Sequence, residues 1–256
     1  MTSIFDVKQE KEFLNSLVSD YKDVSPYSEI KKDIIINYID SVLKDDKNKR
    51  GLQMGCSNGY ETEQLAKRFD QLDVVDGAEA FVEKLKAEEK YQNVNFIFSL
   101  FEEFEVDEVN KYDYVFCNYV LEHVYDSAKI LSQISRLLKR GGTLFVVVPN
   151  GLALSRRIAL SMGMLNELEA LTENDKVHGH RKVYTLEKIS SELENSGFKI
   201  QTIKGIVFKI LADFQLNKLL KENFFTTTHI MALQQLANEP GNLNFSDSFF
   251  IISKWN

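Results

Sequence analysis

The sequence contains few cysteines, prolines and glycines, and this scarcity narrows the classes of protein to which it can belong. Among 256 residues there are two cysteines, three prolines and 12 glycines. Cys56 and Cys117 are too few for a disulfide framework, and they lack the spacing of a zinc site. We therefore expect no metal site and a reducing, cytoplasmic setting.

Long apolar runs and an excess of positive charge are also missing. No uninterrupted apolar run approaches the roughly 20 residues that a membrane-spanning helix needs, and the first dozen residues mix acids and bases, unlike a signal peptide. The net charge of −7 leaves no basic excess that would neutralise phosphate groups. We expect a monomeric or homodimeric protein that binds neither membranes nor nucleic acids.

The apolar pattern changes near residue 49. Residues 1–48 carry apolar side chains at helical spacing and are expected to form an N-terminal helical cap. Residues 49–256 alternate short apolar strands with amphipathic helices, which is typical of a Rossmann-like, doubly wound, mostly parallel α/β sheet. A helical insertion is expected at about 150–183, after strand five, and a second helical stretch at about 208–238. The seven expected strands lie at 51–54, 72–75, 93–98, 112–117, 143–148, 198–203 and 248–255.

A glycine-containing turn, "GLQMGCSNGY", joins the first expected strand to the first expected helix. Gly55 and Gly59 allow a sharp turn and a close approach of the backbone to a ligand. Asp76 ends the second expected strand, where a carboxylate can bind ribose hydroxyls. Thr62 stands where a dinucleotide-binding turn has its third glycine, and no Walker lysine follows Gly59. The turn therefore favours a nucleoside ligand without a phosphate group over a plain connection beside a surface aspartate.

Five segments between about residues 50 and 205 follow the order of a known family: "GLQMGCSNG", "VVDGAEAF", "SLFEEF", "KYDYVFCNYVLEHVYD" and "LLKRGGTLFVVVPN". They resemble the class I S-adenosylmethionine-dependent methyltransferases, in particular the bacterial small-molecule group with a Leu-Glu-His-Val turn after strand four. The resemblance implies S-adenosylmethionine as methyl donor and S-adenosylhomocysteine as product. Three positions depart from the family's pattern, since Gln53 and Leu100 stand where acids are usual and Ser57 where a glycine is usual.

The resemblance also implies which residues contact the donor. Gly55, Cys56, Ser57 and Gly59 line its methionine and ribose, and Asp76 binds the ribose hydroxyls. Gly77, Leu100 and Phe101 flank the adenine, and Asn118 and Tyr119 lie beside the reactive methyl group. The predicted donor contacts are Gly55, Cys56, Ser57, Asn58, Gly59, Asp76, Gly77, Leu100, Phe101, Asn118 and Tyr119.

The acceptor is expected to be a small molecule bound by the segment "NDKVHGHRKVYT" of the insertion. Similar methyltransferases carry a histidine and an aromatic residue here. His180 is the predicted base or acceptor-orienting group, with His178 as a second catalytic candidate and Tyr184 as a wall. The alternative is that both histidines are solvated loop residues. Arg181 is predicted to clamp a phosphate or carboxylate of the acceptor, or else to be a surface charge.

Three further side chains are expected near the acceptor or the donor. His123 is a predicted acceptor contact beside Glu122. Some similar ubiquinone-pathway enzymes use this neighbourhood for a divalent metal, but adjacent side chains point in different directions, so we expect none here. Tyr21 and Tyr27 lie in the N-terminal helices, which the resemblance predicts to form a lid over the donor. Tyr27 is also a predicted acceptor contact, and both rings have simple core packing as an alternative.

The expected reaction is methyl transfer to an oxygen of a sugar, or of a phosphorylated precursor of a surface polysaccharide or secondary metabolite. N-methylation of a small amine and a catalytically silent donor-binding protein are the alternatives. A short-chain dehydrogenase would account for the spacing of Tyr184 and Lys188, but it needs a serine about a dozen residues earlier, where the chain has "EALTEN". A nucleic-acid aminomethyltransferase needs prolines after the fourth strand, and "CNYVL" contains none.

Overall fold

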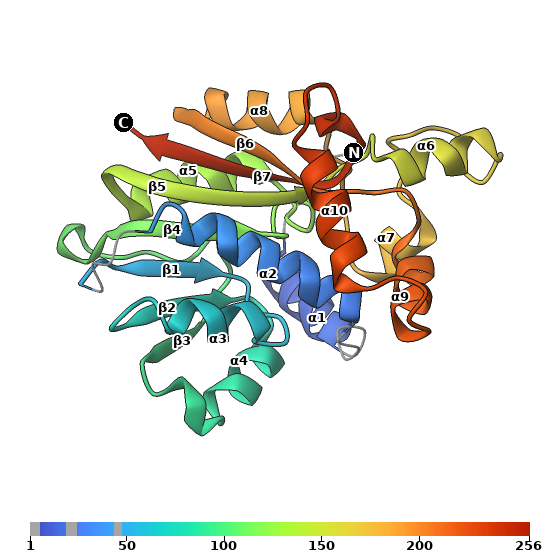
Figure 1. The fold of residues 1–256 in the computed structure, drawn as a ribbon. Coiled ribbons are helices and arrows are strands. Elements are labelled where there is room, and N and C mark those ends of the chain that lie inside the picture. Colours follow the sequence, from blue (N-terminus) through green and yellow to red (C-terminus); the bar gives the residue numbers. More distant parts are fainter. Residues whose placement is uncertain (1–5, 19–24, 44–47) are drawn as a thin grey trace.

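Seven strands form one sheet in the computed structural model, which describes residues 6–18, 25–43 and 48–256. The strands are β1 (Gly51–Met54), β2 (Leu72–Asp76), β3 (Val94–Phe98), β4 (Tyr112–Asn118), β5 (Leu138–Pro149), β6 (Phe198–Phe208) and β7 (Ser246–Trp255). Their order across the sheet is β3-β2-β1-β4-β5-β7-β6 (Figure 1).

The five strands from β3 to β5 are parallel, and β7 runs antiparallel between β5 and β6. This confirms the predicted doubly wound, mostly parallel sheet with a return strand. Two strands are longer than the apolar pattern predicted. β5 begins at Leu138, which pairs with Tyr112 of β4, and β6 runs on to Phe208, which pairs with Ser246 of β7. Strand pairing extends β5 back through the polar residues 139–142, and it extends β6 past Lys204 and Gly205 to the apolar residues 206–208.

Helices precede, follow and separate the strands. They are α1 (Val7–Leu17), α2 (Pro26–Asp40), α3 (Tyr60–Ala66), α4 (Glu79–Lys86), α5 (Ser127–Leu137), α6 (Leu154–Ser161), α7 (Glu173–Val177), α8 (Leu186–Asn195), α9 (Asp213–Lys221) and α10 (Thr227–Ala237). Short 3-10 turns are η2 (Glu89–Tyr91), η3 (Glu108–Asn110) and η4 (Leu243–Phe245). Within the described ranges, no helix combines the length and apolar character needed to cross a bilayer.

Apolar side chains bury both faces of the sheet. On one face Ile35 of α2 and Leu65 of α3 are fully buried in a core that includes Phe145 of β5. On the other face Ile130 of α5 and Ile189 of α8 are fully buried in a core with the strands. The middle strands are therefore covered on both sides, as expected for continuous apolar runs in a parallel sheet.

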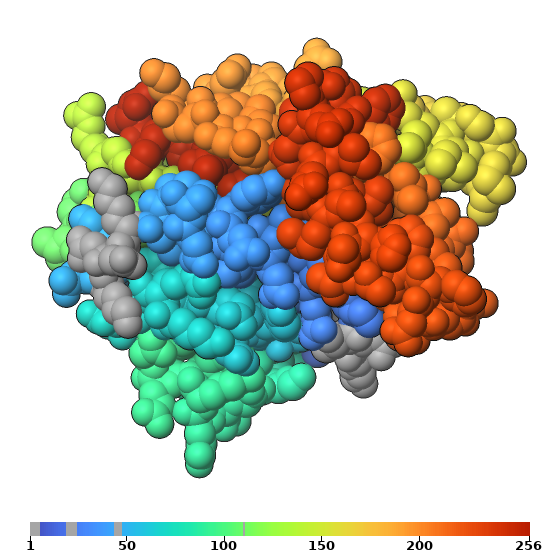
Figure 2. Space-filling model, in the orientation of Figure 1, coloured from blue at the N-terminus to red at the C-terminus, as the bar shows by residue number. Residues whose placement is uncertain are grey.

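Local sequence sets several helix ends. The Ser25 side chain accepts a hydrogen bond from the Ser28 amide, and Pro26 occupies the first turn of α2. Thr185 caps α8 in the same way, and Gly197 follows that helix with a φ of 84°. The expected helical insertion contains α6 and α7, and the later stretch contains α9 and α10. Figure 2 shows this later stretch, in orange and red, lying against the blue N-terminal helices.

Candidate active site

The glycine turn adopts the backbone conformation for which glycine is suited. Gly55 and Gly59 have φ values of 79° and 83°, and Ser57 between them has 47°. A side chain at Gly59 would come 2.5 Å from the Tyr91 hydroxyl, which donates a hydrogen bond to the Gly59 carbonyl at 3.0 Å. The turn is therefore fixed by steric contact as well as by φ. Ser57 stands where the family usually has a glycine, and it keeps the left-handed conformation that glycine adopts more readily.

Asp76 lies at the end of β2 and faces this turn. Its carboxylate accepts hydrogen bonds from the Cys56 amide and the Ala78 amide, each at 2.8 Å. Burial raises the pKa of Asp76, although these amide hydrogen bonds act in the opposite direction. Gln53, where the family usually has an acid, donates to the Gly55 carbonyl at 3.0 Å. The turn and the acid thus form one unit.

The predicted adenine contacts lie beside helix α1. A side chain at Gly77 would come 3.0 Å from Leu100 and 2.6 Å from Leu14 of α1. Asn15 of α1 accepts a hydrogen bond from the Ala80 amide at 3.2 Å. Phe101 follows Leu100 and is half-buried. Helix α1 therefore covers the side of the site that the resemblance assigns to adenine.

The same helix reaches the insertion. Arg181 is bound by the Glu10 carboxylate of α1, at 3.0 Å and 2.9 Å to its two oxygens. The Arg181 guanidinium also lies 4.8 Å from the centre of the Phe13 ring. The structure thus places the Arg181 guanidinium against α1, and a clamp on the acceptor would require this ion pair to open. Tyr21, the other expected lid residue, lies outside the described residues.

The end of β4 carries two of the predicted contacts. Asn118 donates to the half-buried Glu61 carboxylate at 2.6 Å, and its own amide oxygen has no hydrogen-bond partner within the described part of the chain. Burial raises the pKa of Glu61. Tyr119 has a φ of 56°, a left-handed conformation that a bulky residue rarely adopts. Asn58 of the glycine turn accepts a hydrogen bond from Lys32 at 3.2 Å.

Four titratable side chains meet beyond the end of β4. The His180 Nδ1 lies 3.1 Å from the Asp175 carboxylate, and the His123 and His180 rings are 4.7 Å apart between centres. The Glu122 side chain is 1% exposed, and among the described residues neither of its oxygens has a hydrogen-bond partner. The ligand atoms of Glu122, His123 and His180 lie within 4.8 Å of one another, close enough to hold a metal ion. Folding of the insertion brings these side chains together, although the adjacency of Glu122 and His123 predicted no shared site.

The surroundings shift the pKa values of these groups. Burial raises the pKa of Glu122 to about 7 and lowers the pKa of His123 to about 3. Burial would also raise the pKa of Asp175, but hydrogen bonds from His180 and Thr172 hold it below its ordinary value. Asp175 therefore remains ionised and orients the His180 ring, with Nδ1 as the protonated nitrogen.

Two predicted acceptor residues face other partners. The His178 Nδ1 lies 2.8 Å from the Asn174 carbonyl, within its own turn. Tyr184 is 1% exposed, and its hydroxyl donates to Glu192 of α8 at 2.9 Å. Tyr184 is therefore a core residue whose hydroxyl is already bound, not a wall of the acceptor site. Lys188 pairs with Glu169, so the spacing that suggested a dehydrogenase does not form a Tyr–Lys pair.

Sequence reasoning missed a second charged group near Tyr119. Lys31 of α2 lies 2.9 Å from Asp247 of β7 and 3.4 Å from Asp213 of α9, and Lys209 pairs with the same two aspartates. Lys209 and Asp213 are four residues apart, but Lys31 and Asp247 come from distant parts of the chain, so no motif marks the group. The only available signals were Asp247 in the otherwise apolar terminal strand and Lys209 in the loop after β6.

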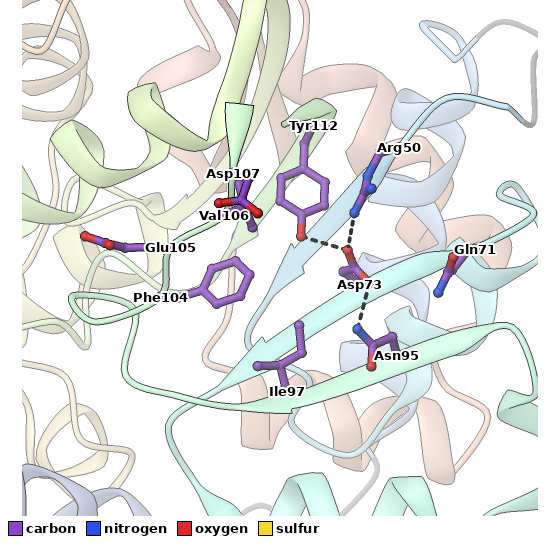
Figure 3. A pocket seen from close by; sticks show the side chains of 10 residues that line it. All are labelled: Arg50, Gln71, Asp73, Asn95, Ile97, Phe104, Glu105, Val106, Asp107 and Tyr112. Atoms are coloured by element: carbon purple, nitrogen blue, oxygen red, sulfur yellow. Dashed lines mark hydrogen bonds and ion pairs between the residues drawn. The ribbon is translucent and has the colours of Figure 1, made fainter. Parts of the chain in front are cut away.

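A cavity of about 520 Å³ lies at the opposite edge of the sheet. Figure 3 shows Arg50, Asn95 and Tyr112 pointing at Asp73, which accepts hydrogen bonds from all three at 2.9, 3.0 and 2.7 Å. These residues stand at the starts of parallel strands, whereas Asp76 and Asn118 stand at the ends of theirs. Ligands of open α/β sheets bind beyond the carboxyl ends of the strands, so this cavity is not the donor site.

Known proteins share this sequence pattern and this fold. A family model described as a methyltransferase domain matches residues 29–203. The ubiquinone biosynthesis O-methyltransferase of Saccharophagus degradans is 29% identical over 184 residues, which cover 71% of this chain and 76% of that protein. The enzyme of the same name from Marinobacter nauticus is 29% identical over 196 residues, covering 72% of this chain and 81% of its own.

Solved structures show the same fold at low sequence identity. The N-methyltransferase NodS from Bradyrhizobium japonicum, in complex with S-adenosylhomocysteine, has a TM-score of 0.57 at 12% identity and covers 98% of both chains. An S-adenosylmethionine-dependent methyltransferase from Mesorhizobium loti has a TM-score of 0.59 at 13% identity, covering 85% of this chain and 96% of its own. With the matching model spanning more than half of its length, the chain belongs to the methyltransferase-domain family and is a class I enzyme that uses S-adenosylmethionine.

Proposed function

We propose that this enzyme transfers the methyl group of S-adenosylmethionine to a hydroxyl oxygen of a small-molecule acceptor, with His180 as the general base. The observation that carries the proposal is the Asp175–His180 pair, 3.1 Å apart, beyond the end of β4. A neutral hydroxyl is a poor nucleophile and gains from a base that removes its proton, whereas a neutral amine needs less help. An oriented histidine therefore favours oxygen over nitrogen as the acceptor atom.

The donor side of the proposal rests on the turn and on Asp76. Gly55 to Gly59 would hold the methionine and ribose, and Asp76 would accept hydrogen bonds from the ribose hydroxyls. The Asp76 carboxylate has already accepted two backbone amides, which fixes its orientation and leaves room for further donors on its oxygens. Gly77, Leu100 and Phe101 would flank the adenine, under helix α1.

The reaction then needs alignment and one proton transfer. The acceptor oxygen attacks the methyl carbon in line with the sulfur, the carbon–sulfur bond breaks, and sulfur keeps the electron pair as the neutral thioether of S-adenosylhomocysteine. The hydroxyl proton passes to Nε2 of His180, while Nδ1–H donates to Asp175, as in other oriented histidine bases. Asn118 and Tyr119 would lie beside the methyl group.

The names of the relatives and the Asp175–His180 pair both bear on which class of acceptor we propose. The relatives are named for O-methyl transfer in ubiquinone biosynthesis, and none of those reported above is named for polysaccharide synthesis. We therefore rank hydroxylated ring compounds ahead of the sugar or polysaccharide precursors that the sequence led us to expect. N-methylation and a silent donor-binding protein have no comparable support, because neither requires the Asp175–His180 pair.

The test is a radiolabelled methyl-transfer screen over catechols, sugars, sugar phosphates and small amines. We expect incorporation into a hydroxyl compound, and loss of that incorporation in His180→Ala with donor affinity retained. Incorporation into amines alone, or full activity of His180→Ala, would refute the proposal. Calorimetry with S-adenosylhomocysteine serves as the control for an intact donor site.

A further inference from the structure

Two lysines and two aspartates form a cluster beside Tyr119, here called the lysine clamp: Lys31, Lys209, Asp213 and Asp247. The side chains of Lys31, Lys209 and Asp247 are 12%, 17% and 3% exposed, whereas that of Asp213 is 47% exposed. Burial alone would lower the pKa of each lysine, but the two aspartates raise it above its ordinary value, so both remain cationic.

The clamp is connected to the residue expected beside the methyl group. The Tyr119 hydroxyl lies 3.1 Å from the Ser248 hydroxyl, which donates to Asp247 at 2.8 Å. Lys31 itself lies 5.8 Å from the centre of the Tyr119 ring. Glu122, which lies beside His123 and His180, follows Tyr119 by three positions in the chain. Tyr119 therefore connects to the lysine clamp through Ser248, and it lies three residues before Glu122, which packs beside His180.

One polar group in this region has no partner. Tyr27 is 0% exposed, and within the described ranges its hydroxyl makes no hydrogen bond. Leaving a buried hydroxyl unpaired costs free energy of folding, which a phenylalanine would avoid. Lys31 lies 4.8 Å from the centre of the Tyr27 ring, so the unpaired group belongs to the same region as the clamp. An unpaired hydroxyl beside Lys31, in a cluster that holds a second lysine, is suited to an anionic oxygen.

Asp213 is the member of the clamp that an anion can most readily displace. It projects from α9, and its side chain is far more exposed than the other three. Without Asp213, two lysines would face a single carboxylate, that of Asp247, and carry a net positive charge. A ligand anion between Lys31 and Lys209 would restore neutrality and also pair the Tyr27 hydroxyl.

We propose that Lys31, Lys209 and Tyr27 bind a carboxylate or phosphate group of the acceptor and thereby hold its hydroxyl near His180. The inference rests on the proposed function for the role of that acceptor, but the anion site itself is testable without turnover. It assigns specificity for anionic acceptors to residues from α2 and from the loop that follows β6.

The test is calorimetric titration of the protein saturated with S-adenosylhomocysteine, using inorganic phosphate in one arm and benzoate in the other. We expect wild type to bind one of the two anions, and the arm that binds identifies the anion class. Tyr27→Phe should weaken that binding about tenfold or more, the scale of a hydrogen bond to a charged group. The double variant Lys209→Met with Asp213→Asn removes one charge of each sign and should weaken it similarly. Lys218→Met, an exposed lysine on α9, is the matched control and should bind like wild type.

The outcomes separate an anion site from a purely structural ion-pair network. A structural network predicts that Tyr27→Phe, which removes only an unpaired hydroxyl, changes no binding constant. If wild type binds neither anion, or if both variants bind as wild type does, the inference is overturned. Because this titration measures binding and the hydroxyl screen measures methyl transfer, failure of either experiment is distinguishable from failure of the other.

Discussion

The proposed donor half of the site, which is the glycine turn with Asp76, differs in construction from the proposed acceptor half, which holds the Asp175–His180 pair, Arg181 and the lysine clamp. In the donor half the Cys56 amide and the Asp76 carboxylate, which hold the glycine turn, are 20 residues apart in the chain. In the acceptor half Arg181 and Glu10 are 171 residues apart, and Lys31 and Asp247 are 216 apart. The donor half is a strand-turn-helix unit with its neighbouring strand, whereas the acceptor half exists only after distant segments have packed. Four predictions test this division.

The largest expected effect is on chemistry in the acceptor half. His180→Ala should reduce kcat by about 100- to 10,000-fold, the range for loss of a general base, and leave donor affinity unchanged. Steady-state kinetics and calorimetry with S-adenosylhomocysteine measure the two quantities. His178→Ala is the control, because its ring nitrogen lies against the Asn174 carbonyl of its own turn. A parallel loss of donor affinity in His180→Ala would show that the two halves are not separable.

The next effect concerns the donor half. Asp76→Ala should weaken binding of S-adenosylmethionine by about 1.5–3 kcal/mol, the scale of hydrogen bonds to a charged group. Calorimetry gives the affinity, and thermal unfolding reports any loosening of the turn that Asp76 also holds. Asp70→Ala, an exposed aspartate just before β2, serves as the control. Unchanged donor affinity in Asp76→Ala would remove Asp76 from the ribose site.

A pH-dependent effect on stability is expected in the acceptor half. The folded-state pKa of Glu122 is about 7, raised by burial from an ordinary value of 4.5. An unfolded chain releases this proton near pH 4.5, whereas the folded chain keeps it up to about pH 7. The free energy of unfolding therefore falls as the pH rises between these two values. Glu122→Gln should therefore stabilise the protein at pH 8 by on the order of 2 kcal/mol, with little difference at pH 4.

Urea unfolding at the two pH values, in the presence of a chelator, measures this difference. Glu187→Gln on the exposed side of α8 is the matched control. An equal stability difference between wild type and Glu122→Gln at both pH values would contradict a raised pKa for Glu122.

The smallest effect tests the one connection between the halves. Glu10→Gln weakens the ion pair that joins α1 to Arg181, and should cost about 0.5–1 kcal/mol in the packing of that helix. Because α1 covers Gly77, donor affinity should fall by a few-fold. Glu12→Gln, exposed on the same helix, should have no effect. Calorimetry at low and high salt would show whether the difference shrinks with screening, as an ion pair requires.

Sequence alone predicted much of the fold and located the glycine turn that we propose as the donor site. The apolar runs located all seven strands, because strands buried on both faces need continuous apolar side chains. The glycines at 55 and 59 and the acid at 76 marked their turn, because left-handed φ values and close contacts restrict the residue type. Strand ends were less predictable, as β6 shows, because pairing with β7 carries it past Lys204 and Gly205 to Phe208.

The acceptor half was less predictable for a physical reason. His180 was identified from its segment, but its partner Asp175 was not, since only the turn after α7 brings the carboxylate to the ring. Arg181 and Tyr184 were assigned to the acceptor, yet Glu10 and Glu192 bind them, and both partners come from other elements. A charged or polar side chain binds the partner that lies nearest in the folded structure, and the sequence does not show which residue that is.

The sequence by itself therefore determined the family, the order of strands and helices, the methyl donor and the glycine turn, because periodicity and backbone conformation act over a few neighbouring residues. Only the tertiary structure decided which side chains surround the proposed acceptor site. It paired His180 with Asp175, bound Arg181 to Glu10 of α1 and gathered Lys31, Lys209, Asp213 and Asp247 from α2, the loop after β6, α9 and β7. Charges and buried hydroxyls find partners across space, and those partners exist only once the sheet is covered.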